Sequence, residues 1–432
     1  MRHSFSPRRR LSAHLMSSPM GRMALRSLLS NHQIDVVRDT TDYDVCIVDI
    51  RAYTPASRQW MSLLHQSQRQ SALSPLIYMV ASDQLADEAV LSLAKTQHVV
   101  LWAPNGRPLI NAIQKTVALK NKAQEVSIRL KASATAALPL ELDQPSPSHS
   151  PQTLLLSQPQ GEALHLLNEL HSHGEIAGVL SQSQALQSLE LGIANGVFLF
   201  ANPNRRPQHK WIRLLRRQSE LMSLPVIIFE RNVTERHIQY WTHAGADAVF
   251  SIDHAYLASQ FMRRAIQLRG SLNQYDHILK KMVFTDKGAV SEVASGPYFD
   301  RCLAERFLGS PLDFALGVLR LFPKEGENHQ TALSEAAVYI ALAGQPLDLV
   351  SRPAPDTFIF SFPNANKASV TALMQSYEQM ITDLKFGGIE NSSTFTAKSY
   401  AVFPKSGDSP QTSLTALFKG LSTLKDTERL FA

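Results

Sequence analysis

The chain has 432 residues, 44% of them hydrophobic, with 43 Lys plus Arg against 37 Asp plus Glu. The apolar fraction excludes a disordered chain, the length predicts two to four domains, and no apolar run reaches the 18 residues that a membrane span needs. The formal charge of +6 is accounted for by the first 34 residues, which hold six arginines and no acid. The rest of the chain is therefore neutral, which argues against a protein that coats nucleic acid.

Residues 1–14 are predicted to be a disordered basic tail, because they lack the apolar core of a secretory signal. Cys46 and Cys302 are too few and too far apart for a disulfide framework or a metal-ligand set. This cysteine usage fits the reducing cytoplasm, and we expect neither a metal nor a cofactor.

Two segments of the chain repeat the same layout of short apolar runs and helical patterns. Runs that are short, continuous and rich in β-branched residues are typical of parallel strands buried on both faces. A stretch rich in Pro and Ser, here taken as 126–152, separates the segments and predicts a linker. We therefore expect two α/β domains with open parallel sheets, at 15–125 and 153–270. The predicted strands are 45–48, 76–80 and 98–102 in the first domain, and 154–156, 196–200, 225–229 and 248–250 in the second.

Residues 256–283 are predicted to form one long helix with an apolar heptad seam. This seam has two interpretations that the sequence leaves open, a dimer stalk or packing of the helix on its own chain. Its residues are Phe261, Ala265, Leu268, Leu272, Tyr275, Leu279 and Met282.

The remaining residues, 271–432, change character and predict an α+β domain. Strand-like runs at 314–322 and 357–362 flank a tight-turn sequence at 352–356.

Motifs in the last two domains resemble two bacterial signalling families. Residues 224–229 followed by 243–248 are similar to the end of response-regulator receivers, which have a doubly wound, flavodoxin-like fold. Thr285-Asp286 followed by Phe299 resembles the entry helix of GGDEF domains, the fold of diguanylate cyclases. The order receiver, receiver, GGDEF is that of the PleD and PopA type of cell-cycle regulators.

The resemblance implies that the cyclase chemistry is lost. The family's turn of Gly, Gly, acid and Glu is matched here by Ala354, Pro355, Asp356 and Thr357. A strand-end metal carboxylate of the family is matched by Val318, which cannot bind a hard cation. We therefore expect a non-enzyme, although a cyclase with altered motifs remains the alternative.

The family's inhibitory Arg-x-x-Asp site, which binds cyclic di-GMP, is matched by Gln345 and Asp348, with Arg352 as a substitute cation nearby. Gln345 lacks the charged fork with which arginine contacts guanine and phosphate. The resemblance thus leaves two roles open for the third domain, a sensor of cyclic di-GMP or a protein-binding surface.

Asp49 stands where receivers carry their phosphoacceptor, at the end of the third strand. The acids that would hold Mg²⁺ are missing at 16–19, so we interpret Asp49 as a structural acid, with a phosphorylation-driven switch as the alternative. The resemblance implies a cytoplasmic adaptor, recruited to a cell pole, that forms a homodimer. Its partners would be other signalling or cell-cycle proteins, and we expect no nucleic acid among them.

Overall fold

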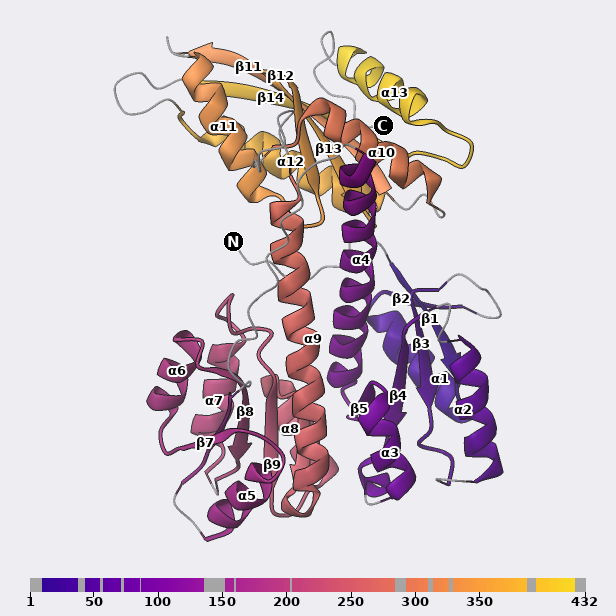
Figure 1. The fold of residues 1–432 in the computed structure, drawn as a ribbon, viewed down its shortest axis with the longest axis vertical. Helices are drawn as coiled ribbons and strands as arrows, with labels where there is room; N and C mark the ends of the chain where they lie inside the picture. Colours follow the sequence, from indigo (N-terminus) through magenta and orange to yellow (C-terminus); the bar gives the residue numbers. More distant parts are fainter. Residues whose placement is uncertain are drawn as a thin grey trace. The chain divides into compact units, whose positions relative to one another are not determined.

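The computed structural model describes residues 10–37, 43–54, 57–70, 74–85, 87–135, 152–158, 161–202, 204–283, 293–309, 314–325, 329–386 and 394–423. The chain divides into two compact units. The first unit comprises residues 1–120 and 144–272, and the second comprises residues 121–143 and 273–432 (Figure 1). Among the described helices, none combines the length and the apolar character that crossing a bilayer would require.

The first copy of the repeated fold is a five-stranded parallel sheet in the order β2-β1-β3-β4-β5. Helices cover both faces, so the strands are buried on each side, as their continuous apolar runs predicted. In the described chain no helix intervenes between β2 and β3. The elements are β1 (Leu11–Met16), α1 (Pro19–Asn31), β2 (Ile34–Val37), β3 (Val45–Asp49), α2 (Arg58–Gln70), β4 (Leu76–Val80), η1 (Ser82–Gln84), α3 (Glu88–Thr96), β5 (Val99–Leu101) and α4 (Arg107–Thr135).

The second copy has the corresponding order, β10-β9-β8-β6-β7, again all parallel. This is the flavodoxin-like doubly wound order in both copies, so the predicted fold class is confirmed for the first two domains. The elements are β6 (Gln152–Leu156), α5 (Gly161–His171), β7 (Ile176–Val179), α6 (Gln182–Glu190), β8 (Ala194–Phe200), α7 (Arg206–Leu215), β9 (Val226–Glu230), α8 (Glu235–Ala244), β10 (Ala248–Ser251), η2 (Ile252–His254) and α9 (Ala255–Lys281).

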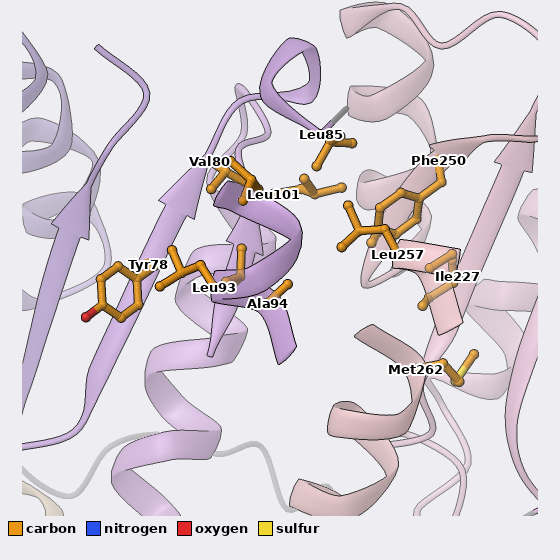
Figure 2. Close-up of a cluster of buried hydrophobic side chains, with 14 of the residues drawn as sticks. Tyr78, Val80, Leu85, Leu93, Ala94, Leu101, Ile227, Phe250, Leu257 and Met262 are labelled. Atoms are coloured by element: carbon orange, nitrogen blue, oxygen red, sulfur yellow. The ribbon is translucent and has the colours of Figure 1, made fainter. Parts of the chain in front are cut away.

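The two copies share one apolar cluster inside the first unit. Leu93, Ala94 and Leu101 of the first copy belong to the same buried cluster as Phe250 and Leu257 of the second (Figure 2). The first copy contributes α3 and β5 to this contact, and the second copy contributes β10 and α9. Polar contacts extend it, for example from Asn105 Nδ2 to Thr242 Oγ1 at 2.9 Å and from Arg107 Nη1 to the carbonyl of His243 at 2.6 Å.

The second unit contains a four-stranded antiparallel sheet in the order β12-β13-β11-β14. The succession β11-α11-β12-β13-α12-β14 is the β-α-β-β-α-β arrangement of ferredoxin-like folds, which confirms the predicted α+β class. The elements are α10 (Gly296–Leu308), β11 (Phe314–Glu325), α11 (His329–Ala343), β12 (Leu349–Ala354), β13 (Thr357–Pro363), α12 (Lys367–Asp383), β14 (Thr394–Val402) and α13 (Pro410–Thr423).

Several predicted boundaries are wrong. Strand β1 begins at Leu11, inside the predicted 1–14 tail, because apolar side chains there pack into the first core. Helix α4 runs to Thr135, well into the predicted 126–152 linker, because no Pro or Gly interrupts it before that point. The prolines that suggested the linker lie outside the described residues, as does the Thr285-Asp286 motif.

The long helix predicted at 256–283 is confirmed as α9, and its seam is used inside the chain. In the first unit Phe261 packs against the shared apolar cluster. In the second unit Leu279 and Met282 are fully buried, in one cluster with Val126 and Ala132 of α4. The packing favours the intramolecular interpretation of the seam, and the homodimer stays a prediction.

Candidate functional site

Two arginines, Arg352 and Arg320, donate hydrogen bonds to the hairpin that matches the GGDEF turn. The turn itself consists of Pro355 and Asp356 between β12 and β13, so residues 352–354, predicted as turn, belong to a strand. Pro353 is tolerated there because β12 is an edge strand. Arg352 folds over the turn and donates from Nε and Nη2 to the carbonyl of Pro355 at 3.0 and 2.6 Å.

Asp356 is engaged within the chain. Its carboxylate accepts from Arg320 Nε at 2.9 Å and from Thr357 Oγ1 at 2.9 Å. Burial alone would raise the pKa of Asp356, yet the hydrogen bonds from Thr357 and Arg320 hold that pKa below its usual range. The acid is therefore ionised at neutral pH and already neutralised by a side-chain cation.

The residues around this hairpin do not fit Mg²⁺. Val318 is fully buried in an apolar cluster with Leu316 and Ile359, so no oxygen ligand points from that position. A divalent ion at Asp356 would meet the guanidinium of Arg320. Among the described residues, no three His, Cys, Asp or Glu side chains gather into a metal-binding group.

The stretch Gln345–Asp348 forms a tight loop that closes on itself. The carboxylate of Asp348 accepts from the backbone N–H of Gln345 at 3.0 Å, and the backbone N–H of Asp348 donates to the carbonyl of Gln345 at 2.8 Å. Asp348 is only 7% exposed, whereas the Gln345 side chain faces solvent. Asp348 is therefore bonded within the loop, while Gln345 lies at the surface.

A buried arginine that sequence reasoning missed holds this loop. In the second unit Arg129 of α4 donates from Nη2 to the carbonyls of Pro346, Leu347 and Asp348 at 3.3, 3.1 and 3.0 Å. Its Nη1 donates to the carbonyl of Leu279 at 2.9 Å. The buried guanidinium of Arg129, which belongs to α4, thus bonds both the end of α9 and the loop.

The carboxylate of Glu125 lies between Arg129 and a second buried arginine, Arg306. Arg129 Nε lies 2.9 Å from Glu125 Oε1, and Arg306 Nη2 lies 2.6 Å from Glu125 Oε2. Burial alone would raise the pKa of Glu125, but the two guanidinium groups hold it below its usual value. All three side chains are buried, so each depends on the others for its solvation.

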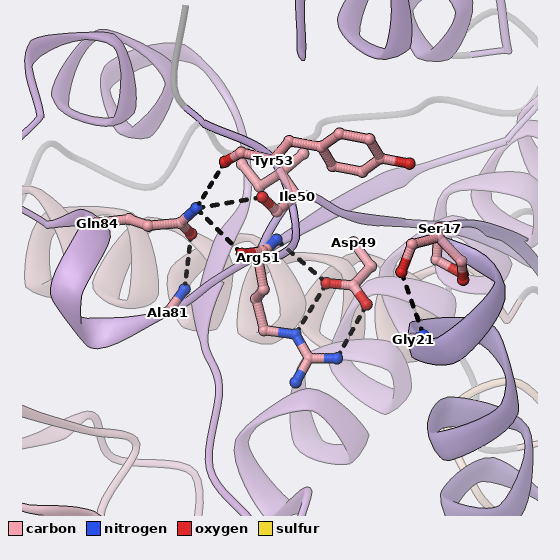
Figure 3. Close-up of polar contacts among 9 residues, drawn as sticks. Ser17, Gly21, Asp49, Ile50, Arg51, Tyr53, Ala81 and Gln84 are labelled. Carbon is pink, nitrogen blue, oxygen red and sulfur yellow. Dashed lines mark hydrogen bonds and ion pairs between the residues drawn. The ribbon is translucent and has the colours of Figure 1, made fainter. Parts of the chain in front are cut away.

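Asp49 is buried at the end of β3 and paired with Arg51 (Figure 3). Arg51 donates from Nε to Oδ1 at 2.8 Å and from Nη2 to Oδ2 at 2.9 Å, which satisfies both carboxylate oxygens. The guanidinium lies 4.0 Å from the centre of the Trp102 ring. On the other side, a Cβ at Gly21 would come within 2.6 Å of Oδ2, so helix α1 begins directly against the carboxylate.

The chain after Asp49 is held by Gln84. The side-chain amide of Gln84 donates to the carbonyls of Ile50 and Tyr53 at 3.2 and 3.1 Å, and its oxygen accepts from the backbone N–H of Ala81 at 3.0 Å (Figure 3). In the second copy Gln208, on α7, donates to the carbonyl of Phe200 at 2.9 Å, and Arg205 pairs at 2.8 Å with Glu230 at the end of β9. At this end of each sheet, an arginine therefore occupies the space beside the acid.

We expect beryllofluoride with Mg²⁺, which mimics an acyl phosphate, to leave the protein unchanged. Both oxygens of Asp49 are hydrogen-bonded to Arg51, and the guanidinium holds the position that a cation would take. Tryptophan fluorescence is a suitable measurement because Trp102 lies beneath Arg51. A fluorescence change that disappears in Asp49→Asn would show instead that Asp49 is a working phosphoacceptor.

Comparison with known proteins gives likeness of fold. No protein-family model matches the chain, and no curated protein matches it. Among solved structures it is similar to the GGDEF domain of DgcB from Caulobacter crescentus in complex with c-di-GMP (16% identity, TM-score 0.27, 31% of this chain and 85% of that one). It is also similar to response regulator RPA3017 in red light signaling of R. palustris (20% identity, TM-score 0.22, 25% of this chain and 89% of that one). A third similar structure is diguanylate cyclase SiaD in complex with its activator SiaC from Pseudomonas aeruginosa (13% identity, TM-score 0.29, 58% of this chain and 87% of that one). At these values the likeness carries no argument about activity, and the fold assignment rests on the strand orders of the three sheets.

Proposed function

We propose that this chain is a non-catalytic signalling adaptor built from two pseudo-receivers and a degenerate GGDEF domain. It acts in the network of two-component and cyclic di-GMP signalling through protein–protein contacts. One observation carries the proposal: the position of the cyclase metal ligand is Val318, buried in an apolar core, while the remaining acid Asp356 is neutralised by Arg320.

The two pseudo-receivers support the same interpretation. In the first, Arg51 occupies both oxygens of Asp49, and in the second the third strand ends in Phe200. Neither offers a carboxylate free to accept a phosphoryl group. We propose that the copies supply a rigid docking body, with other signalling or cell-cycle proteins as partners, in the cytoplasm and recruited to a cell pole as in the PleD and PopA type. Homodimer formation through exposed surface belongs to this proposal.

The third domain serves, in this proposal, as a protein-binding surface and not as a ligand sensor. Its loop at 345–348 has Asp348 bonded to its own backbone and its carbonyls bonded to Arg129. Helix α11 supports a docking role because Leu342 is 71% exposed and Tyr339 is 43% exposed on the same helix. Large apolar side chains in solvent are a recurrent feature of protein-interaction surfaces.

We expect the purified protein to form no cyclic di-GMP from GTP and Mg²⁺. Without a carboxylate at Val318 and with Asp356 paired to Arg320, the charge that develops on the triphosphate has no metal to stabilise it. Chromatographic detection of the product measures this. Turnover that is lost in Asp356→Ala would overturn the proposal and make the chain a cyclase of altered motif.

A further inference from the structure

The first unit contains a cavity of about 460 Å³ between the two copies of the repeated fold. Its walls come from β5 and α4 of the first copy and from β10 and α9 of the second. The cavity volume lies within the range of small-molecule sites in proteins. None of the residues considered above for phosphotransfer or cyclase chemistry lines it, so it requires a separate explanation.

The cavity wall carries basic side chains among uncharged polar ones. His98, Lys115 and Arg264 line it, and Asp247 is the single acid among the lining residues. Asp247 is already saturated, because it accepts from Arg216 Nη2 at 3.0 Å, from the backbone N–H of Val226 at 2.9 Å and from Lys115 Nζ at 3.4 Å. Among the described residues, no hydrogen bond or ion pair partner of Arg264 is present.

The pKa of His98 reflects its burial and the positive charges near it in the cavity wall. Its burial, together with the nearby charges of Arg264 and Lys115, lowers the pKa of His98 to about 4. It is therefore neutral at pH 7, with Nδ1 at 3.2 Å from Thr116 Oγ1. Burial also lowers the pKa of Arg264. Burial is the first cause of both shifts, the charges of Arg264 and Lys115 add to that of His98, and an anion in the cavity would raise the pKa of His98.

The rest of the wall suits a flat heterocycle. Apolar surface is provided by Leu101, Ile227 and Phe261, while Gln97 and Gln260 add carboxamide groups. Carboxamides present a donor and an acceptor side by side, which is the pattern that matches the edge of a nucleobase. The lining thus combines the cations Lys115 and Arg264 with apolar and carboxamide groups, a combination that suits a ligand with an anionic end and a heterocyclic end.

We propose that this cavity binds a nucleoside monophosphate or a heterocyclic organic phosphate of the same size. The phosphate lies against Arg264 and Lys115, and the heterocycle lies against the apolar wall and the two carboxamides. Because the wall is shared between the copies, the ligand stabilises the contact between them, and its binding does not depend on the role proposed for the third domain.

Calorimetric titration of the full chain tests this, with AMP and GMP as probes and with inorganic phosphate, adenosine and guanosine as partial ligands. We expect at least one nucleotide to bind, the partial ligands to bind at least tenfold more weakly, and Arg264→Gln to weaken the nucleotide at least tenfold. Arg213→Gln is the matched control, because Arg213 is exposed on α7 in the same unit and lies outside the cavity.

A second measurement uses the wild type alone, so it does not depend on correct folding of a variant. In the NMR titration of the wild type, bound nucleotide should raise the pKa of His98 from its low starting value. The proposal is overturned if no probe binds at millimolar concentration, or if Arg264→Gln binds as well as Arg213→Gln. Inorganic phosphate binding as tightly as the nucleotides would replace the proposed ligand class with a simple anion.

Discussion

Replacing Arg129 with alanine is expected to destabilise the second unit by about 3–5 kcal/mol, the usual cost of breaking a buried ion pair from one side. The change leaves Glu125 with Arg306 alone and removes the donor from the carbonyls of residues 346–348. Each buried acceptor left without a donor adds its own desolvation cost. Arg129→Lys should recover only part of the loss, because an ammonium cannot reproduce the planar fork.

The distribution of tryptophans makes this prediction specific to one unit. All four, Trp60, Trp102, Trp211 and Trp241, belong to the first unit. In Arg129→Ala we therefore expect the denaturant transition seen by tryptophan fluorescence to stay in place. Hydrogen exchange of peptides from α10 through β13 should become faster.

Gln124→Ala is the matched control, because Gln124 is exposed on the same helix, one residue before Glu125. It should leave both measurements unchanged. Equal exchange rates in the Arg129 and Gln124 variants would mean that the buried cluster contributes nothing to the second unit.

The buried strands could be predicted from the sequence because their physical signal is local. Strands β3, β4, β8 and β9 lie inside parallel sheets, so each is a continuous apolar run. The resemblance placed strand β1 before residues 16–19, but the predicted tail overlapped it, because Ser12 and His14 interrupt its apolar residues and a run of arginines precedes it. Strand β12 was missed because Pro353 suggested a turn, although an edge strand tolerates proline.

The partners of the candidate site residues could not be predicted, because the contacts that decide their chemistry are distant in sequence. The acid Asp356 was identified, but the salt bridge from Arg320, 36 residues earlier, depends on how β11 pairs with β13. Arg129 lies more than 200 residues before the loop that it holds, and a single arginine in a helix resembles a solvated side chain. Arg51 was the exception that a local rule could have found, since it follows Asp49 by two residues.

Restoring arginine at position 345 is expected to create measurable affinity for cyclic di-GMP. Gln345 is exposed, so the side chain is accommodated without repacking. A guanidinium fork that contacts guanine N7 and O6 contributes about 1–3 kcal/mol, which corresponds to a gain of roughly 5- to 150-fold. The wild type should give no calorimetric signal up to high micromolar ligand, because Asp348 is bonded to the loop backbone and Gln345 carries no guanidinium fork.

Two matched variants distinguish the effect of the planar guanidinium fork from the effect of its charge and from the contribution of Asp348. Gln345→Lys carries the same charge without the planar fork and should remain near the wild type. The double variant Gln345→Arg with Asp348→Ala should lose most of the gain if the acid takes part in binding. Micromolar affinity in the wild type that Asp348→Ala abolishes would make the third domain a cyclic di-GMP sensor. No gain in Gln345→Arg would mean that the loop, held by Arg129 through its carbonyls, has a backbone conformation that excludes the ligand whatever its side chains.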